Sequence, residues 1–443
     1  MMNWDTLLSA KRFGLEDRKI STTADARSQF QRDFDRIIFS SPFRRLQNKT
    51  QVFPLPGSIF VHNRLTHSLE VASVGRSIAN RVAMELQKKQ DISDKDILNE
   101  LHSIVGAACL CHDMGNPPFG HAGEDAISKY FEEGAGRNLR DKISSEEWND
   151  LVNFEGNANA LRLLTRQFRG RRKGGFALTY TTLASLIKYP YGSELNGKKY
   201  GYFQSERNTF QKIAEELDLM KISDFPVKYA RHPLVYIVEA ADDICYEIMD
   251  IEDAHKLKIL DTNKAFELLL GFFDAQEDKE FLENKEQVFH EVTDLNEQVA
   301  YLRASVINKL VNETAGIFLK GHDRILHGDF DASLIDSLQG KTREAFLNCK
   351  ELAFNEIYNH RSVVKIELTG FNVLGTLLEE FVYAMLNPHY NYSKKLLSLI
   401  PNQFITKENA TVYEKVRSVL DFVSGMTDLY AVDLYKDIKG ISI

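Results

Sequence analysis

Cysteine is scarce in this sequence and follows no pattern. The 443 residues include 4 cysteines, Cys109, Cys111, Cys245 and Cys349, and no CxxC pair. A disulfide-rich secreted fold and a thiolate-rich structural zinc site are therefore not indicated. Few, unpatterned cysteines in a long chain are typical of a protein in a reducing cytoplasm, where we expect this chain to lie.

Long apolar runs and an excess of basic residues are also lacking. The longest apolar stretches are a few residues, whereas a helix needs about 20 to cross a bilayer. The N-terminal residues lack the basic segment and apolar run of a secretory signal. The net charge of -8 argues against a general polyanion binder, although a local basic pocket can still hold a phosphate ligand.

What the chain does contain is ordinary globular material with helical periodicity. Hydrophobic residues make up 43% and charged residues 27%, enough for a sizeable core. Apolar residues recur at steps of three and four, which predicts a mainly α fold with at most a few short strands. A short strand is expected at 363–368, where apolar and polar residues alternate. We predict helices that begin near Leu65, Ile97 and Pro233, and others around 295–312, 334–358 and 371–386.

Polar residues fall on three of these helices. His67 lies near the start of the first, His112 and Asp113 at the end of the second, and Asp242 within the third. Either histidine alone is more often a core residue than a ligand. Asp242 differs, because a carboxylate on an apolar helix is costly to bury unless it is paired or binds a metal.

The third helix also carries acids at other positions. Asp242, Tyr246 and Asp250 are spaced i, i+4 and i+8, so they share a face. A solvated face with Asp243, Glu247 and Asp250 is the alternative. Two imidazoles and two carboxylates would suit Mn²⁺, Fe²⁺, Mg²⁺ or Zn²⁺. Cys111 would point to another side of its helix and is interpreted as a packing residue.

The order His, His-Asp, Asp resembles that of the HD phosphohydrolase superfamily, and flanking motifs narrow the resemblance. The chain resembles bacterial dGTP triphosphohydrolases from about residue 12 to 255, with no motif matched beyond. The resemblance implies an N-terminal segment 1–61 with part of the nucleotide site, an HD catalytic domain 62–255, and a helical C-terminal region 256–443 for core packing and oligomer contacts. The matching motifs are 44–53, 64–71, 112–124, 154–157, 188–190 and 239–244.

The same resemblance assigns residues to chemistry. It implies that His67, His112, Asp113 and Asp242 are metal ligands, with Mn²⁺ or Mg²⁺ expected first and Fe²⁺, Co²⁺ or Zn²⁺ as alternatives. It also implies a catalytic pair, in which His121 acts on the scissile phosphate or its leaving group and Glu124 orients the histidine and tunes its pKa. The pair is spaced i, i+3, so one helical turn would bring the two together.

Further residues would bind the nucleotide. By resemblance, Gln51 and Asp250 contact the sugar near its 3′ oxygen, and Tyr246 packs on the deoxyribose. Arg64 and Lys188 contact the phosphates. Alternatively, Arg64 and Lys188 are ordinary solvated cations, and Tyr246 and Tyr189 are ordinary tyrosines at the edge of a core. The expected substrate contacts are Gln51, Arg64, Asn116, Lys188, Tyr189, Tyr246 and Asp250.

The function implied is hydrolysis of dGTP to deoxyguanosine and inorganic triphosphate. A broader dNTP triphosphohydrolase, perhaps activated by a second nucleotide, is the nearest alternative. An HD nucleotidase or phosphodiesterase would not need His121 and Glu124. A catalytically silent nucleotide sensor or nucleic-acid binder is the alternative of another class. The sequence has no GxxxxGK[ST] loop, so a P-loop NTPase is disfavoured.

Two other features concern partners. The basic run 166–173 could touch the triphosphate or bind single-stranded DNA, or simply be a solvated loop. The resemblance implies homo-oligomers, often hexamers. His360, Arg361 and Lys365 could then contribute to a nucleotide site at a subunit interface.

Overall fold

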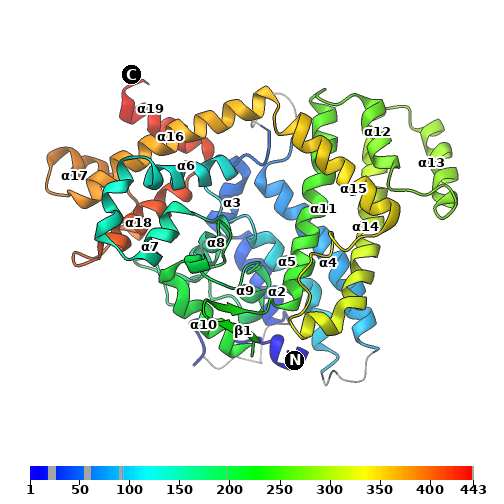
Figure 1. The fold of residues 1–443 in the computed structure, drawn as a ribbon, viewed down its shortest axis with the longest axis horizontal. Coiled ribbons are helices and arrows are strands. Elements are labelled where there is room, and N and C mark those ends of the chain that lie inside the picture. The colour runs from blue at the N-terminus through cyan, green and yellow to red at the C-terminus, as the bar shows by residue number, and fades with distance from the viewer. Residues whose placement is uncertain (18–25, 54–60, 89–91, 93, 196, 442–443) are drawn as a thin grey trace.

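The computed structural model describes residues 1–17, 26–53, 61–88, 92, 94–195 and 197–441. These residues are mostly helical, as Figure 1 shows, so the predicted mainly α fold is confirmed. Within the described ranges, strands are limited to β1 (Lys221–Asp224) and β2 (Val227–Tyr229), an antiparallel pair. No described helix has the length and apolar character needed to cross a bilayer.

Three helices at the centre of the molecule carry the polar clusters. They are α4 (Arg64–Leu86), α5 (Leu101–Cys111) and α11 (Pro233–Lys256), which pack against one another. Helix α4 begins with a capping box between Asn63 and Thr66, which satisfies two backbone N–H groups. Helix α11 begins with Pro233, a residue suited to the first helical position because its missing N–H needs no partner there.

The first hydrophobic core surrounds these central helices. Helix α14 (Leu295–Leu326) packs along α11 and α4, and α2 (Gln29–Ile38) packs on α5. The three helices that were expected to begin near Leu65, Ile97 and Pro233 are thus buried together in one core. The other elements on this side are α1 (Trp4–Leu7), α3 (Ser41–Arg45), α9 (Tyr180–Leu186), α10 (Arg207–Glu216), α12 (Thr262–Leu270), α13 (Lys279–Glu291) and α15 (Gly340–Leu352).

A second core joins the segment after the His112 turn to the C-terminal helices. Helix α6 (Gly120–Glu132) packs against α16 (Arg361–Leu386), and α16 packs against α18 (Val412–Ser424). Figure 1 shows this group at the opposite end from α12 and α13. The remaining helices of this group are α7 (Ser145–Val152), α8 (Gly156–Thr165), α17 (Asn391–Ser398) and α19 (Asp428–Lys439).

The strand expected at 363–368 is wrong, because these residues form the first part of α16. Six residues of alternation are outweighed by a longer helical pattern, in which Val363, Gly370, Val373, Leu374 and Leu377 are buried. The helix expected around 371–386 is the second half of the same α16, and the one expected at 334–358 begins at Gly340 as α15.

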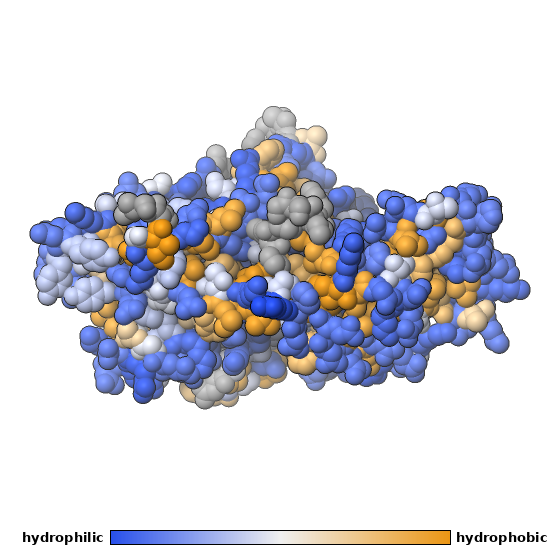
Figure 2. All heavy atoms as spheres, turned by 90° about the horizontal axis from the view of Figure 1, so that it is seen from above, coloured by the Kyte–Doolittle hydropathy of each residue, from blue (hydrophilic) through white to orange (hydrophobic). Residues whose placement is uncertain are grey.

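The face that includes α16 has a mixed surface. In Figure 2, which views the molecule from above Figure 1, apolar patches lie among hydrophilic residues. Exposed apolar side chains on α16 include Val364, Leu368 and Phe371.

Candidate active site

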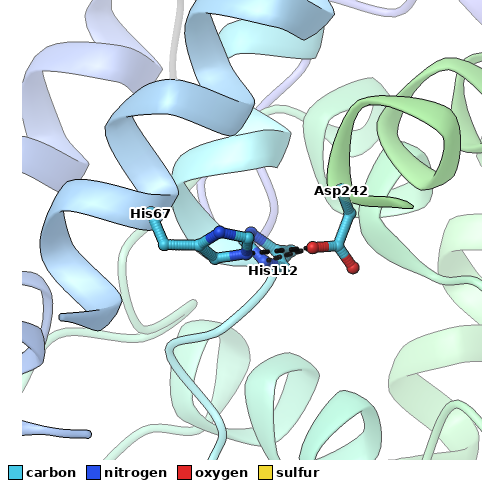
Figure 3. Close-up of side chains that lie close together, drawn as sticks. All are labelled: His67, His112 and Asp242. Carbon is cyan, nitrogen blue, oxygen red and sulfur yellow. Dashed lines mark hydrogen bonds and ion pairs between the residues drawn. The ribbon is translucent and has the colours of Figure 1, made fainter. Parts of the chain in front are cut away.

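Side chains from the three central helices meet at one point. His67 of α4, His112 just after α5 and Asp242 of α11 offer atoms that all lie within 4.8 Å of one another. Asp242 Oδ1 lies 3.0 Å from His67 Nε2 and 3.4 Å from His112 Nε2. Figure 3 shows both rings turned toward the Asp242 carboxylate. The folded chain thus brings together three of the four expected metal ligands.

The hydrogen bonding of His112 leaves one of its ring nitrogens without a partner. Its Nδ1 donates a hydrogen bond to the Cys109 carbonyl oxygen at 2.6 Å. Its Nε2 is buried without a hydrogen-bond partner. A donor bond from one ring nitrogen to a backbone carbonyl is the arrangement that presents the other nitrogen to a metal. An orphaned buried nitrogen beside a carboxylate therefore fits a divalent cation.

The electrostatics of this group show strong mutual dependence. Burial lowers the pKa of His112, but the carboxylates of Asp113 and Asp242 outweigh burial and raise that pKa to about 9. Burial disfavours the charged form of Asp242, yet His112 and His67 hold the pKa of Asp242 well below its usual range. The site therefore stabilises the ionised form of Asp242 and favours a positive charge beside it.

Asp113, the fourth expected ligand, lies at the edge of this group. Its Oδ2 accepts a hydrogen bond from Arg64 Nη1 at 2.6 Å, and its Oδ1 accepts one from Asn116 Nδ2 at 2.5 Å. The same Oδ1 lies 3.6 Å from His112 Nε2. Arg64 is buried and its Nε has no partner. Asp113 therefore holds Arg64, the residue expected to bind phosphate, next to the candidate metal ligands.

His121 and Glu124 form a pair at the start of α6. His121 Nδ1 lies 2.8 Å from Glu124 Oε2, and Glu124 Oε1 accepts a hydrogen bond from the Gly156 N–H at 2.7 Å. Glu124 is buried, whereas the His121 side chain is 71% exposed. The hydrogen bond to Glu124 raises the pKa of His121. The pair thus presents an imidazole to solvent while a buried carboxylate holds its position.

The backbone around this pair is tightly constrained. Phe119 and Gly120 both have left-handed backbone, with φ of 64° and 60°, and this conformation is uncommon for a residue other than glycine. A Cβ at Gly156 would lie 2.1 Å from Asn116 Oδ1. Only glycine therefore permits the approach that lets its N–H reach Glu124.

Two of the residues expected to bind the sugar, Tyr246 and Asp250, lie on α11, the helix that carries Asp242. The Tyr246 ring packs edge-on against His67, with centroids 6.5 Å apart. Asp250 is buried and accepts a hydrogen bond from the Tyr358 hydroxyl at 2.8 Å. Burial raises the pKa of Asp250 well above its usual range. Gln51 has a buried Oε1 without a partner, so it has unused capacity for a ligand.

Lys188 contacts α11 at Glu239, about one turn before Asp242, and Tyr189 lies beside it. Lys188 Nζ is 3.1 Å from Glu239 Oε1 and 5.9 Å from the centre of the Tyr189 ring. Burial lowers the pKa of Lys188, but Glu239 outweighs it and the net shift is upward. This lysine is therefore a cation with a carboxylate partner that a triphosphate would have to replace.

Four residues that matter to this geometry were not found by sequence reasoning. Lys199 Nζ lies 3.0 Å from Glu155 Oε2, next to Glu124. Tyr358 contacts Asp250, and Asp428 binds the backbone of Phe119 and Thr50. Lys49 lies inside a motif that was recognised, but its side chain had no assigned role. The other three belong to segments without a recognised motif, so no local signal was available.

Comparison with known proteins adds independent information. Residues 64–173 match the HD domain, and residues 337–437 match the phosphohydrolase-associated domain. The second match lies where sequence reasoning found no motif. It spans α15 and the C-terminal helices from α16 into α19, and it includes Tyr358 and Asp428.

Whole-length relatives are also found. The chain is 38% identical to a deoxyguanosinetriphosphate triphosphohydrolase-like protein of Synechocystis, over 100% of both chains. It is 35% identical to a protein of the same description from Pseudomonas aeruginosa, over 100% of this chain and 99% of the relative. A deoxyguanosinetriphosphate triphosphohydrolase of Klebsiella pneumoniae is 30% identical over 96% of both chains.

Proposed function

Because this chain belongs to the deoxyguanosinetriphosphate triphosphohydrolase family of HD-domain hydrolases, we propose that it is a metal-dependent dGTP triphosphohydrolase. The reaction is dGTP + H₂O to deoxyguanosine and inorganic triphosphate. The observation that carries the proposal is the group of His67, His112 and Asp242, in which His112 Nε2 has no hydrogen-bond partner. Arg64 binds Asp113 beside this group, and its positive charge also acts on His121.

The metal would be held by His67, His112 and Asp242, with Asp113 as the fourth ligand. The orphaned Nε2 of His112 and the ionised Asp242 support this donor set. Mixed imidazole and carboxylate ligands suit Mn²⁺ or Mg²⁺, with Fe²⁺, Co²⁺ and Zn²⁺ as alternatives. When bound, a divalent ion supplies Lewis-acid polarisation of the α-phosphate and makes a water molecule more acidic.

The chain's own residues then position the nucleotide. Arg64 and Lys188 would bind the phosphates as cations, with Asn116 and Tyr189 beside them. Tyr246 would pack on the deoxyribose. Asp250, which Tyr358 binds, and Gln51, whose Oε1 has no partner, would accept a hydrogen bond from the 3′-hydroxyl.

His121 would act as a general acid. A water oxygen forms a bond to the α-phosphorus, the bond between that phosphorus and O5′ breaks, and a proton passes to O5′. The protonated His121 can supply this proton from its exposed edge, because the hydrogen bond to Glu124 raises its pKa. Glu124 in turn is held by the Gly156 N–H.

The test is phosphorus NMR of the products from dGTP with Mn²⁺. Intact triphosphate as the first product supports cleavage at the α-phosphorus, whereas pyrophosphate or orthophosphate would overturn the roles of His121 and Glu124. The other dNTPs and GTP, measured in parallel, decide between dGTP and broader substrate use, with or without an activating nucleotide. Metal-bound protein without turnover of any nucleotide would favour a sensor.

We further propose a cytoplasmic homo-oligomer. The apolar side chains exposed on α16 support a subunit contact on that face. His360, Arg361 and Lys365, at the start of the same helix, line one cavity with Asp428, which would place this cavity beside such a contact. Single-particle mass measurement at working concentration tests the assembly, and a lasting monomer would contradict it.

A further inference from the structure

A cavity of about 660 Å³ lies against the turn 112–116, whose Met114 lines it. Its walls come mainly from α3, α8, the segment 166–176 and the end of α18, and the lining includes none of the proposed metal ligands, catalytic residues or substrate contacts. This volume is typical of small-molecule pockets, at roughly 300–1,000 Å³. The charged residues on its walls are Arg45, Lys49, Arg166, Arg171, Arg172 and Asp421.

The single carboxylate on these walls is already occupied. Asp421 accepts hydrogen bonds from Arg162 at both oxygens, at 2.6 and 2.8 Å. Arg166 reaches the same carboxylate only at 3.8 Å. The cavity therefore holds a surplus of positive charge that the described residues do not neutralise.

Arg45 shows this surplus most clearly. Its side chain is half-buried, and burial lowers its pKa. Within the described ranges it has no hydrogen-bond or ion-pair partner. Even partial burial of a cation without a partner is unfavourable, so an anion in the cavity would offset the lost hydration of Arg45.

Lys49 connects the cavity to the candidate metal site. Its Nζ donates hydrogen bonds to the backbone carbonyls of Asn116 and Ser424, at 2.5 and 2.8 Å. Burial lowers the pKa of Lys49 to about 7, and an anion nearby would favour its charged form. Asn116 also holds Asp113 through its side chain. Lys49 and Asn116 thus link the cavity wall to Asp113, one of the proposed metal ligands.

We propose that this cavity is a second anion site, which binds a polyphosphate group independently of the candidate active site. The ligand carries phosphates because planar guanidinium groups bind them through paired hydrogen bonds. The side chains of Phe168 and Phe176 also line the cavity, so a nucleotide with an aromatic base and free inorganic polyphosphate share this chemistry. The inference does not rest on the proposed hydrolysis.

The experiment is calorimetric titration with inorganic triphosphate, and separately with ATP, in the presence of a metal chelator. The double variant R45Q/R172Q removes two of the positive charges that line the cavity, and R169Q is the matched control. Arg169 belongs to the same loop but is not part of the cavity lining. Thermal unfolding confirms that each variant is folded.

We expect R45Q/R172Q to lose one triphosphate site per chain, or to bind it at least about tenfold more weakly, while R169Q binds like the unaltered protein. Tighter binding of ATP than of triphosphate at that site identifies a nucleotide, and equal binding identifies the phosphate group alone. Unchanged binding in R45Q/R172Q overturns the proposal. Equal weakening in R169Q, or binding of an oligonucleotide but not of triphosphate, overturns it as well. Turnover is not used, so failure here leaves the proposed function untouched.

Discussion

The Asp428 carboxylate accepts a hydrogen bond from the backbone N–H of Phe119 at 3.0 Å. Its other oxygen accepts one from the N–H of Thr50 at 2.8 Å. Phe119 has left-handed backbone and stands two residues before His121, and Thr50 directly precedes Gln51. One side chain at the start of α19 therefore fixes both the turn of the proposed catalytic pair and the segment of a proposed sugar contact.

Replacing Asp428 by Asn should lower turnover without loss of the fold. The amide keeps one acceptor but loses the charge, and each charge-assisted hydrogen bond contributes about 1.5–3 kcal/mol. We expect kcat/KM for dGTP to fall by about tenfold or more. Asp433→Asn is the control, since Asp433 lies on the same helix with a 72% exposed side chain. Equal activity in both variants would show that Asp428 does not position the site.

Replacing Glu124 by Gln should move the pH profile of kcat/KM. Glu124 raises the pKa of His121, so the acid form of His121 persists to higher pH and is lost as pH rises through that raised pKa. Without the carboxylate the pKa falls toward its ordinary value of about 6.5. The basic limb should therefore shift to lower pH. An unmoved limb would mean that His121 is not the acid that this limb reports.

His121→Ala supplies the complementary measurement. Loss of a general acid typically costs about 10²–10⁴-fold in rate, and bound metal should be unchanged because His121 is not in the ligand group. Metal content by elemental analysis and initial rates measure the two quantities. Full turnover in this variant would remove His121 from the mechanism and leave the metal proposal standing.

Asp242→Asn should remove the metal, whereas Asp243→Asn should retain it. Asp242 lies within 3.4 Å of both imidazoles, while its neighbour Asp243 is not in that group. Added Mn²⁺ should raise the unfolding temperature of the unaltered protein and of Asp243→Asn, because a ligand that binds only the folded state stabilises it. A similar response in Asp242→Asn would contradict the assigned ligand set.

Tyr358→Phe should weaken substrate binding through Asp250. The change deletes the hydroxyl that donates to Asp250 Oδ2 at 2.8 Å, so Asp250 loses the group that orients it toward the sugar. We expect a KM for dGTP raised about 3- to 10-fold with a smaller change in kcat, for a bond of about 0.5–1.5 kcal/mol.

A substrate analogue separates this role from general damage to the fold. 2′,3′-Dideoxyguanosine triphosphate lacks the 3′-hydroxyl that Asp250 would bind. Its KM should be the same for Tyr358→Phe and the unaltered protein. A parallel rise in both KM values would mean that Tyr358 supports the fold rather than the sugar contact.

Part of the site could be anticipated because its residues lie in recognisable local contexts. His67 lies in the first turn of a helix, His112 directly follows one and Asp242 lies in the middle of one, and the apolar spacing of all three helices is visible in the sequence. Their meeting within 4.8 Å follows from the packing of α4, α5 and α11. The resemblance of the motifs predicted that meeting, and periodicity alone did not.

Other parts could not be anticipated for the opposite reason. Tyr358, Lys199 and Asp428 reach the site from segments far from it in the chain. The 363–368 alternation was misleading because a pattern of six residues is weaker than the apolar face of a 26-residue helix. The orientation of Asp113 toward Arg64 depends on where α4 lies beside the His112 turn.

The sequence by itself determined that this protein is helical, that its central helices bury their apolar faces, and which family motifs it carries. Helix formation can be read locally because its hydrogen bonds join residues four apart. Only the tertiary structure decided that Asp428 holds the turn before His121, that His112 keeps a free Nε2, and that Arg45 and Lys49 face one cavity. These relationships depend on how distant helices pack, and packing places side chains together that no spacing along the chain connects.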